Sequence, residues 1–254
     1  TYPVLGMRKF QKRFYFVQDY EPYFFARGTS SILTEQSYAS QNDFACICAS
    51  PWLQKRMEDF GNSAISFPLA VDHSVYHCDN SEKRSNQTIA FYVRRSTPRR
   101  LYELGLLALR NLFDLGDNFE VITFGEKDLP DLGIPVKVKH AGILDAKALA
   151  KLYRSCTIGF VLSGTNYSLV PNEMMACGLP VVDIDAEHTR LSYQANTAVL
   201  AEPTPVGLAS ALSRLLNDPT FRETTSKTGL AATEHLAWDT SNKLIEAFIQ
   251  DSLP

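Results

Sequence analysis

Residues 163–182 read SGTNYSLVPNEMMACGLPVV and lie between two apolar runs, 158–162 and 179–184. We expect each run to form a buried strand, with a small-residue loop and a short helix between them. Proline in the first turn of that helix and Gly178 just past its end are typical of short helices. The first-turn N–H groups lack partners within the helix and can bind a phosphate, and Glu173 can accept hydrogen bonds from sugar hydroxyls. The stretch therefore predicts a nucleoside-diphosphate site.

The composition is that of a globular chain with one large α/β domain, or one domain and part of another. Of the 254 residues, 45% are hydrophobic and 21% are charged, so a sizeable core can form. The net charge of −3 argues against nucleic acid as the main partner. The five cysteines have no CxxC spacing, and no apolar run approaches the roughly 18 residues of a membrane span. We expect a cytoplasmic protein with reduced thiols.

Apolar runs and helical patterns alternate along the chain, which predicts a doubly wound parallel sheet. Strands are expected at 13–17, 44–49, 64–68, 89–93, 119–124, 136–138, 158–162, 179–184 and 198–201. Helices are expected near 34–38, 51–60, 98–113, 145–155, 171–177, 205–216, 219–234 and 240–251. The helix around 101–113 is apolar on most of its faces, so we expect it to be buried.

A second candidate loop follows the apolar run 89–93 and reads RRSTPRR at 94–100. Ligands of open α/β sheets bind outside the carboxyl ends of the strands, where this loop is expected to lie. Its four arginines can bind a diphosphate through forked, charge-assisted hydrogen bonds. The helix after the loop is expected to have Thr97 as its N-cap and Pro98 at its first position. The alternative is a solvated helix start with basic surface residues, although the positive end of the helix dipole disfavours arginine there.

The first stretch resembles the Glu-x7-Glu signature of the retaining, GT-B-fold glycosyltransferases of family 4. Glu173 matches the second glutamate, and residues 174–182 match the end of the signature almost residue for residue. Thr165 stands where the signature has its first glutamate, a departure that affects the hydroxyl contact this glutamate makes in the family. In the arginine loop, Arg94 matches the family's pyrophosphate-binding arginine, and Arg99 or Arg100 replaces a lysine.

The resemblance implies how the donor is bound and activated. Arg94, Arg99 and Glu173 would be the catalytic residues of a retaining reaction that needs no divalent metal and no other cofactor. The donor would be a dTDP-, GDP- or UDP-sugar. The donor-binding residues that the resemblance implies are Arg94, Arg99, Arg100, Gly142, Ile143, Leu144, Tyr167, Ser168, Leu169, Val170 and Glu173.

The segment 140–156 is similar to the family segment whose glycine turn packs against the nucleotide base. Ile143 and Leu144 are therefore expected to contact the base, mostly through their backbone. The alternative is an ordinary turn between strand and helix with Asp145 as N-cap. His140 is expected to have a structural role.

The segment 18–25, QDYEPYFF, also follows a predicted strand. Asp19, Tyr20 and Glu21 are candidate contacts for a sugar or an acceptor, because an aromatic ring can stack on a sugar while carboxylates bind its hydroxyls. The alternative is a turn with an aromatic lid. Together with residues 96–109, this segment is similar to bacterial rhamnosyltransferases, which favours rhamnose.

Two patterns resemble metal sites. Asp183-x-Asp185 looks like a metal-binding DxD, but it ends a strand behind the Glu173 helix, which is the wrong context. Residues 73, 77 and 78 have His, His and Cys at metal-like spacing without a fourth ligand nearby. We expect no metal site.

The resemblance also predicts the domain organisation. Residues 1–63 are interpreted as the remnant of an N-terminal acceptor-side domain, and residues 64–236 as the nucleotide-sugar-binding domain. A helix in 237–254 would cross back toward the N-terminal domain and have little left to pack against. Any peripheral membrane association, at the inner face of the membrane, would involve sequence before Thr1.

We therefore expect a glycosyltransferase that transfers a sugar to a glycan or lipid-linked glycan, in bacterial surface polysaccharide synthesis. This chain alone would be weakly active or inactive. One alternative is a non-catalytic binding or assembly module, favoured by Thr165 and opposed by Glu173 and the arginine loop. A second alternative, a sugar-phosphate epimerase, would need histidines in the cleft, and the five histidines are poorly placed for that.

Overall fold

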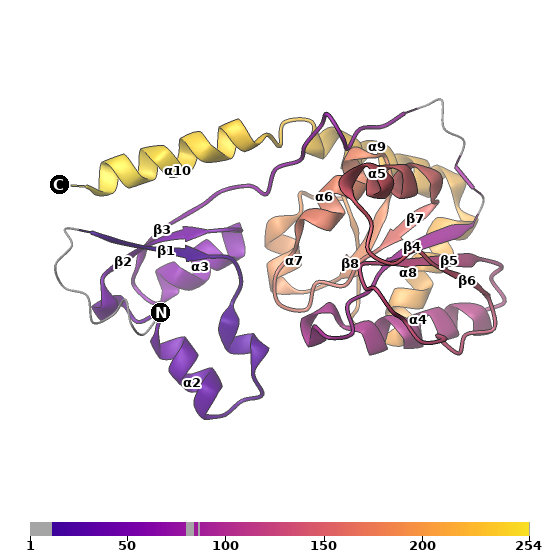
Figure 1. The fold of residues 1–254 in the computed structure, drawn as a ribbon, viewed down its shortest axis with the longest axis horizontal. Helices are drawn as coiled ribbons and strands as arrows, with labels where there is room; N and C mark the ends of the chain where they lie inside the picture. Colours follow the sequence, from indigo (N-terminus) through magenta and orange to yellow (C-terminus); the bar gives the residue numbers. More distant parts are fainter. Residues whose placement is uncertain (1–11, 80–83, 86, 254) are drawn as a thin grey trace. The chain divides into compact units, whose positions relative to one another are not determined.

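The computed structural model describes residues 12–79, 84–85 and 87–253 and divides into two compact units (Figure 1). Unit 1 comprises residues 1–69 and 237–254, and unit 2 comprises residues 70–236. The boundary lies beyond the expected residue 63, because the strand after it pairs within the sheet of unit 1. The polar stretch 77–87 is the best candidate for a linker in the sequence, and part of it lies outside the described residues. None of the helices in the described part has the length and apolar character that a membrane span requires.

The described part of unit 2 contains a six-stranded parallel sheet in the order β6-β5-β4-β7-β8-β9. Its strands are β4 (Thr88–Tyr92), β5 (Glu120–Phe124), β6 (Lys137–His140), β7 (Ile158–Phe160), β8 (Val181–Ile184) and β9 (Val199–Ala201). From β4 the chain adds β5 and β6 toward one edge of the sheet, and from β7 it adds β8 and β9 toward the other edge. The neighbours β4 and β7, with Ile89 opposite Ile158, therefore form a topological switch point, where ligands of such sheets bind.

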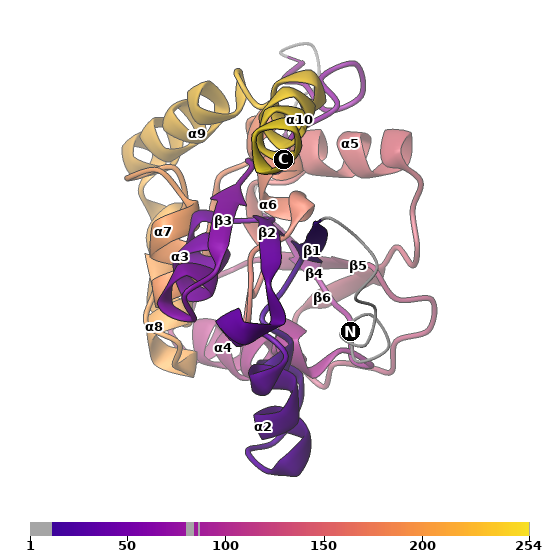
Figure 2. The same ribbon diagram turned by 90° about the vertical axis from the view of Figure 1, so that its left-hand side faces the viewer.

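Helices cover both faces of this sheet (Figures 1 and 2). On one face, α4 and α8 pack together through Leu109, Leu112, Leu208 and Leu212. On the other face lie α5, α6 and α9. The bounds in unit 2 are α4 (Tyr102–Asp114), α5 (Ala146–Ser155), α6 (Leu169–Ala176), α7 (Glu187–Ser192), α8 (Pro205–Asn217) and α9 (Pro219–Thr233).

Unit 1 is a parallel sheet in the order β1-β2-β3, with an aromatic core that includes Trp52 and Tyr38. Its elements are β1 (Arg13–Val17), η1 (Glu21–Phe24), α2 (Thr29–Gln36), η2 (Ser40–Asn42), β2 (Phe44–Cys48), α3 (Pro51–Asp59), β3 (Ser63–Ser66) and α10 (Trp238–Ser252). Helix α10 packs on this core through Ile245, Phe248 and Ile249.

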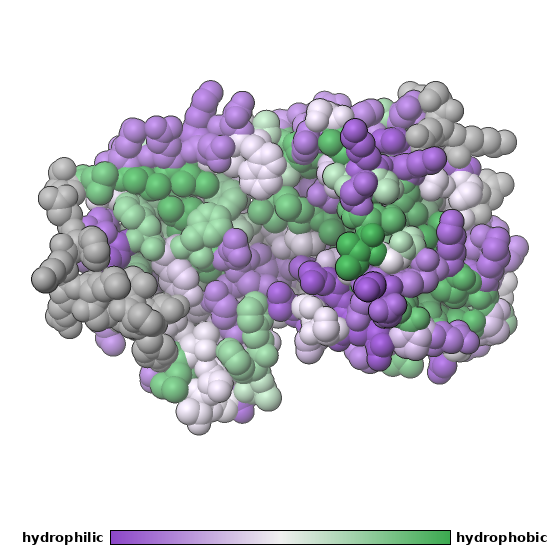
Figure 3. Space-filling view, in the orientation of Figure 1, coloured by the Kyte–Doolittle hydropathy of each residue, from purple (hydrophilic) through white to green (hydrophobic). Residues whose placement is uncertain are grey.

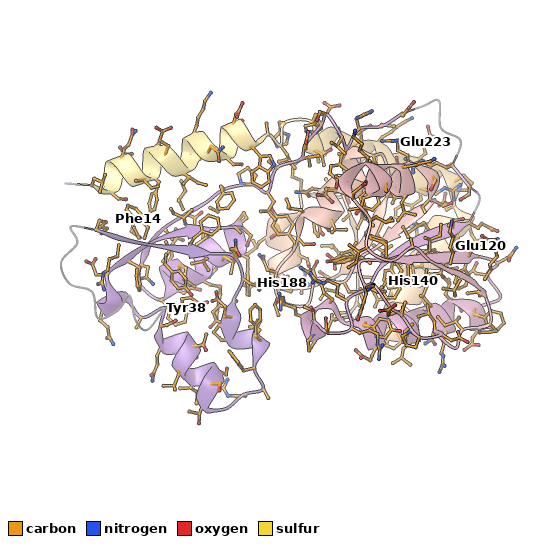
Figure 4. The ribbon with its side chains drawn as sticks, in the orientation of Figure 1. Phe14, Tyr38, Glu120, His140, His188 and Glu223 are labelled. Carbon is orange, nitrogen blue, oxygen red and sulfur yellow. The ribbon has the colours of Figure 1, made fainter. Side chains whose placement is uncertain are left out.

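The packing of α10 corrects the expectation that this helix has little to pack against. The ring of Phe248 meets that of Phe14 edge-on, with centroids 6.4 Å apart, and Figure 4 labels Phe14 and Tyr38. Polar side chains line the outer edge of α10 and apolar ones gather along its inner edge (Figure 3). An amphipathic helix of this kind is stabilised by the burial of its apolar face.

The helix after the arginine loop also differs from expectation. Pro98–Arg100 forms a short 3₁₀ turn, η3, and Leu101 adopts a left-handed conformation with φ 48°. The α-helix begins only at Tyr102, and Thr97 makes no capping hydrogen bond with its side chain. The expectation that this helix is buried holds for one side only: Leu109 and Leu112 are fully buried, whereas Leu107 is 47% and Phe113 39% exposed.

Candidate functional site

The two loops predicted to carry the site follow β4 and β7, the neighbouring strands at the switch point of the sheet. They are joined directly, because the Gly164 N–H donates a 2.9 Å hydrogen bond to the carbonyl oxygen of Arg99. The approach leaves no room for a side chain, since a Cβ at Gly164 would lie 2.7 Å from that oxygen. The structure thus brings the arginine loop and the 163–168 loop together at one end of the sheet.

Two arginines of the arginine loop, Arg95 and Arg100, lie over aromatic rings. The guanidinium of Arg95 lies 5.8 Å from the ring centroid of Tyr102, and that of Arg100 lies 5.8 Å from that of Tyr92. In such cation–π contacts the positive charge is attracted to the negative face of the aromatic ring. Arg94 is exposed and Arg99 is half-buried. The loop therefore keeps cations at the carboxyl end of β4, where a diphosphate could be bound.

Helix α6 begins at Leu169, with Ser168 as an N-cap residue whose side chain makes no capping hydrogen bond. Within the described part of the chain, the buried hydroxyl oxygens of Thr165 and Ser168 have no hydrogen-bond partner. The start of a helix carries N–H groups without partners in the helix and attracts anions. Tyr167, Ser168, Leu169 and Val170 thus lie where the sequence predicts phosphate binding.

Two buried side chains hold the start of the 163–168 loop from behind. The carboxylate of Asp183 accepts a hydrogen bond from the Ser163 N–H at 2.8 Å and another from the Tyr193 hydroxyl at 2.9 Å. A ring nitrogen of His188, labelled in Figure 4, bonds the Ser163 carbonyl oxygen. Burial raises the pKa of Asp183, and its hydrogen bonds act in the opposite direction.

Sequence reasoning examined Asp183 only as part of a false metal motif and missed its positioning role. The available signal was an acidic residue inside an otherwise apolar, buried strand. Asp185, the other half of that motif, forms an exposed ion pair with Arg190. No group of three or more potential metal-binding side chains occurs among the residues that the structure describes.

Glu173 lies on α6 and is half-buried. Burial raises the pKa of its carboxyl from the usual 4.5 to about 7, and a hydrogen bond from the Tyr76 hydroxyl acts in the opposite direction. The ring of Tyr76 stacks on that of Tyr153, with centroids 6.1 Å apart. Sequence reasoning missed Tyr76, which precedes the sheet of unit 2 and gives no local signal of a role beside α6.

The turn predicted to contact a base contains Gly142, at φ +71°, whose carbonyl oxygen accepts a hydrogen bond from Gly125 at 2.9 Å. Ile143 is 72% exposed, which is unusual for a large apolar side chain, and Leu144 is half-buried. Asp145 caps α5 through the Ala148 N–H at 2.8 Å. These features fit both a base contact and an ordinary capped turn, so the base contact stays a prediction.

His140, labelled in Figure 4, has a structural position. Its ring nitrogens lie 2.9 Å from the Thr123 hydroxyl and 3.2 Å from the Lys127 carbonyl oxygen. These contacts link the end of β6 to β5 and to the loop that follows β5. Both ring nitrogens of His140 thus contact other groups of the protein, in keeping with the structural role expected from the sequence.

Of the three candidate sugar contacts in unit 1, Tyr20 is not placed as predicted. Tyr20 is only 1% exposed and its ring is packed against Tyr38, at 5.7 Å, which leaves no open face for a sugar. Its hydroxyl donates to Glu35 at 2.6 Å. Asp19 accepts from the Tyr20 N–H at 2.8 Å, and Glu21 lies 3.3 Å from a tyrosine hydroxyl. The structure therefore places Tyr20 in the core of unit 1 rather than on a binding surface.

At the opposite end of the unit 2 sheet, Arg84 has a structural role. Its guanidinium donates to the carbonyl oxygens of Tyr153 and Cys156, both at 2.9 Å, and of Cys177 at 2.6 Å. It thereby joins the ends of α5 and α6. A cavity of about 670 Å³ lies beside it at the amino ends of the strands, away from the arginine loop.

Comparison with known proteins identifies relatives of this chain. The family described as "WsaF, C-terminal domain" matches residues 87–213. The O-antigen biosynthesis protein RfbC of Myxococcus xanthus is 34% identical over 244 residues, which are 94% of this chain and 19% of that protein. A phosphatidyl-myo-inositol mannosyltransferase of Mycobacterium leprae is 25% identical over 197 residues, 72% of this chain and 52% of that protein. The chain thus spans about a fifth and about half of these relatives.

Solved structures show the same fold at low identity. Sucrose-phosphate synthase of Thermosynechococcus elongatus matches with a TM-score of 0.76 and 18% identity, over 98% of this chain and 70% of that one. Anabaena HepE, in complex with UDP and glucose, matches with a TM-score of 0.74 and 16% identity, over 93% of this chain and 71% of that one. A single-residue mutant of Staphylococcus aureus TarM matches with a TM-score of 0.75 and 12% identity, over 93% of this chain and 50% of that one. The expected parallel-sheet α/β fold of GT-B type is confirmed.

Proposed function

The chain belongs to the family of the WsaF C-terminal domain, and we propose that it is the donor-binding part of a glycosyltransferase of polysaccharide biosynthesis. The observation that carries this proposal is the direct hydrogen bond between Gly164 and Arg99. It unites a cationic loop and a helix start at the switch point of a parallel sheet, which is the usual ligand position in such folds. The relative named for O-antigen biosynthesis, similar over 94% of the chain, supports the polysaccharide assignment.

The proposed donor is a sugar linked to a nucleoside diphosphate. Arginine side chains and helix N-termini both favour phosphate oxygens, and the candidate site offers the two together. The similar folds of HepE and TarM were solved with UDP, which supports a nucleoside diphosphate as ligand. Among dTDP, GDP and UDP donors we favour one that carries rhamnose, on the resemblance of residues 18–25 and 96–109 to rhamnosyltransferases.

The proposed chemistry is retaining and independent of a divalent metal. As the bond between the sugar C1 and the diphosphate oxygen breaks, the departing diphosphate takes the electron pair and gains negative charge. Arg94 and Arg99 would stabilise that charge, together with the N–H groups at the start of α6. Glu173 would accept hydrogen bonds from hydroxyls of the ribose or the sugar.

The acceptor is proposed to be a glycan or a lipid-linked glycan. The cytoplasmic location expected from the cysteines stays a prediction, as does association with the inner face of a membrane.

A non-catalytic nucleotide-sugar-binding module is the second candidate, and Thr165 is the observation that favours it. A hydroxyl replaces the carboxylate that the Glu-x7-Glu signature has at this position, and the Thr165 side chain is almost fully buried. A module of this kind would bind donor without turning it over.

A turnover experiment separates the two candidates. The chain would be incubated with UDP-, GDP- and dTDP-sugars and glycan acceptors, and release of nucleoside diphosphate would be followed beside the Arg94→Ala variant. A glycosyltransferase should release nucleoside diphosphate above the level of the variant. This chain alone is expected to be at most weakly active, so the same assay is run on a form extended at its N-terminus by about 100 residues or more. Tight donor binding with no release above the level of the variant in either form would favour the binding module.

A further inference from the structure

The arginine loop is anchored on a second side, by the loop that follows β5. The backbone N–H of Arg95 donates a 2.5 Å hydrogen bond to the carboxylate of Glu126, two residues beyond the end of that strand. Strand β5 lies beside β4, on the side opposite β7. The bond from Gly164 thus holds the end of the arginine loop at Arg99, and the bond to Glu126 holds its beginning.

The Glu126 bond fixes the peptide group that joins Arg94 to Arg95. A peptide group is planar, so its N–H and its carbonyl oxygen move together. The carbonyl oxygen of this group, which belongs to Arg94, accepts a 3.0 Å hydrogen bond from the Thr97 N–H. Both polar ends of the group are therefore bonded, one within the arginine loop and one to Glu126. The exposed side chain of Arg94 thus extends from a fixed piece of backbone.

Glu126 reaches the arginine loop because of the glycine before it. Gly125 has φ +104°, and a Cβ there would lie 2.5 Å from the ring of Tyr92 and 2.9 Å from the Val93 carbonyl oxygen. The chain that leaves β5 therefore runs directly against the end of β4. The Gly125 N–H also donates to the Gly142 carbonyl oxygen at 2.9 Å. Adjacent residues of this loop thus bond the arginine loop on one side and the turn at Gly142 on the other.

The negative charge of Glu126 and its hydrogen bond act on donor binding in opposite directions. A carboxylate near a diphosphate repels it, so the charge alone would weaken binding. A hydrogen bond from an N–H to a carboxylate is about twice as strong as a neutral one, and this bond holds the arginine loop in place. The direction in which the affinity changes when the side chain is replaced therefore shows which effect prevails.

We propose that Glu126 is a positioning residue of the donor site, which holds the peptide group after Arg94 so that the Arg94 guanidinium is directed toward the diphosphate. Glu126 acts through Arg94 and Arg95 and not by touching the donor. Through Gly125 it also ties the arginine loop to the turn at Gly142, where the nucleotide base is predicted to bind. This inference rests on the proposed function for its ligand, whereas the bond between Arg95 and Glu126 belongs to the free protein.

Three variants separate the hydrogen bond from the charge. Glu126→Ala removes both the acceptor and the charge, whereas Glu126→Gln keeps an acceptor oxygen and removes only the charge. Glu120→Ala is the matched control, because it removes a carboxylate from the other end of the same strand. There, Glu120 forms an exposed ion pair with Lys137 at 2.8 Å. Thermal melts check that each variant is folded.

The first measurement is hydrogen exchange of the Arg95 amide, followed by NMR in the ligand-free chain. Glu126→Ala should speed this exchange about fivefold or more, the scale of one lost hydrogen bond. Glu126→Gln should speed it less, because the amide oxygen can still accept from the Arg95 N–H. Glu120→Ala should leave it unchanged. Equal acceleration in the two Glu126 variants would mean that the charge, and not the hydrogen bond, protects this amide, and would overturn the inference.

The second measurement is the affinity for UDP, GDP and dTDP, each beside its nucleoside, by calorimetry in the presence of EDTA. Glu126→Ala should bind the nucleoside diphosphate about five- to tenfold more weakly than the parent, and Glu126→Gln within about twofold of it. The nucleoside, which has no phosphate, should bind the parent and both variants alike. Glu120→Ala should match the parent with every ligand.

The outcomes separate the inference from the proposed function. Tighter binding of nucleoside diphosphate by both Glu126 variants would show that Glu126 acts only as a repelling charge. A lower melting temperature of Glu126→Ala with unchanged affinity would show a purely structural role, and either result would overturn the inference. Absence of binding by the parent would instead count against the donor site, while the exchange of the Arg95 amide would still decide whether Glu126 holds the loop.

Discussion

The backbone N–H of Gly164 donates a 2.9 Å hydrogen bond to the carbonyl oxygen of Arg99. This single contact fixes the register between the loops after β4 and β7. The Arg99 carbonyl thus bonds a distant loop, and Pro98–Arg100 forms a 3₁₀ turn. The chain then turns through Leu101 and begins α4 at Tyr102, so the arginines stay in a loop at the end of the strand.

Gly164→Ala tests the importance of this contact. The added Cβ would lie 2.7 Å from the Arg99 oxygen, which is closer than van der Waals contact permits, so the loops must separate. We expect a loss of stability of about 1–3 kcal/mol and at least a severalfold weaker binding of nucleoside diphosphate. Gly28→Ala is the matched control, because its Cβ would meet only one atom, at 3.8 Å. Equal behaviour of the two variants would show that the loops can move apart without consequence.

Arg94→Ala should weaken nucleoside-diphosphate binding by about 1.5–3 kcal/mol, the value of a charged hydrogen bond. Since Arg94 is exposed, the melting temperature should change little. Glu173→Gln should reduce the affinity much less. Arg84→Ala is the contrasting variant: it should lower stability, because three carbonyl oxygens lose their donor, and leave binding by the folded protein intact. Loss of binding in folded Arg84→Ala but not in Arg94→Ala would mean that the wrong arginine was chosen.

The pH dependence of stability should carry the signature of Glu173. Its pKa is raised from the usual 4.5 to about 7 in the folded protein, so the folded state binds the proton more tightly. The contribution of this group is fully present below about pH 4.5 and is lost as the pH rises through 7. We expect Glu173→Gln to be more stable than the parent at pH 8, by an amount of the order of 2–3 kcal/mol, and similar to it at pH 4.5. Denaturant unfolding at several pH values measures the difference, and parallel curves for the two proteins would refute the assignment.

Asp183 and Asp185 should respond very differently to the same change. Asp183→Asn alters a fully buried group that bonds Ser163 and Tyr193, so we expect a loss of stability of about 2–5 kcal/mol and weaker donor binding. Asp185→Asn alters an exposed ion pair and should leave both unchanged. Calorimetric titrations of Asp185→Asn with UDP, with and without magnesium, check that its donor binding is unchanged. If Asp185→Asn abolished a magnesium-dependent increase in UDP affinity, the two aspartates would have to be reconsidered as a metal site.

The fold and the two main loops could be predicted from the sequence because their signals are local. Buried strands are continuous apolar runs, and loops after parallel strands must gather at one edge of the sheet. The placement of Glu173 on a short helix could be predicted because a proline marks the start of that helix and a glycine marks its end. These features depend on residues close together in the chain, which is why sequence reasoning found them.

The rest depends on tertiary contacts that leave no local pattern. Tyr76 affects the pKa of Glu173, from which it is far in the sequence, and the Arg99 carbonyl accepts a hydrogen bond from the distant Gly164. Tyr20 was expected to face a sugar because it lies among acids after a strand. Its ring is instead buried against Tyr38 and Trp52, and apolar packing decided its position.

The central claim is that the arginine loop and the start of α6 together bind a nucleoside diphosphate. Isothermal titration calorimetry of the chain with UDP, GDP and dTDP, each in the presence of EDTA and of magnesium, tests it most directly. We predict saturable binding of at least one of them without metal, weakened at least tenfold by Arg94→Ala. Absence of measurable heat for all three, with and without magnesium, would contradict the account.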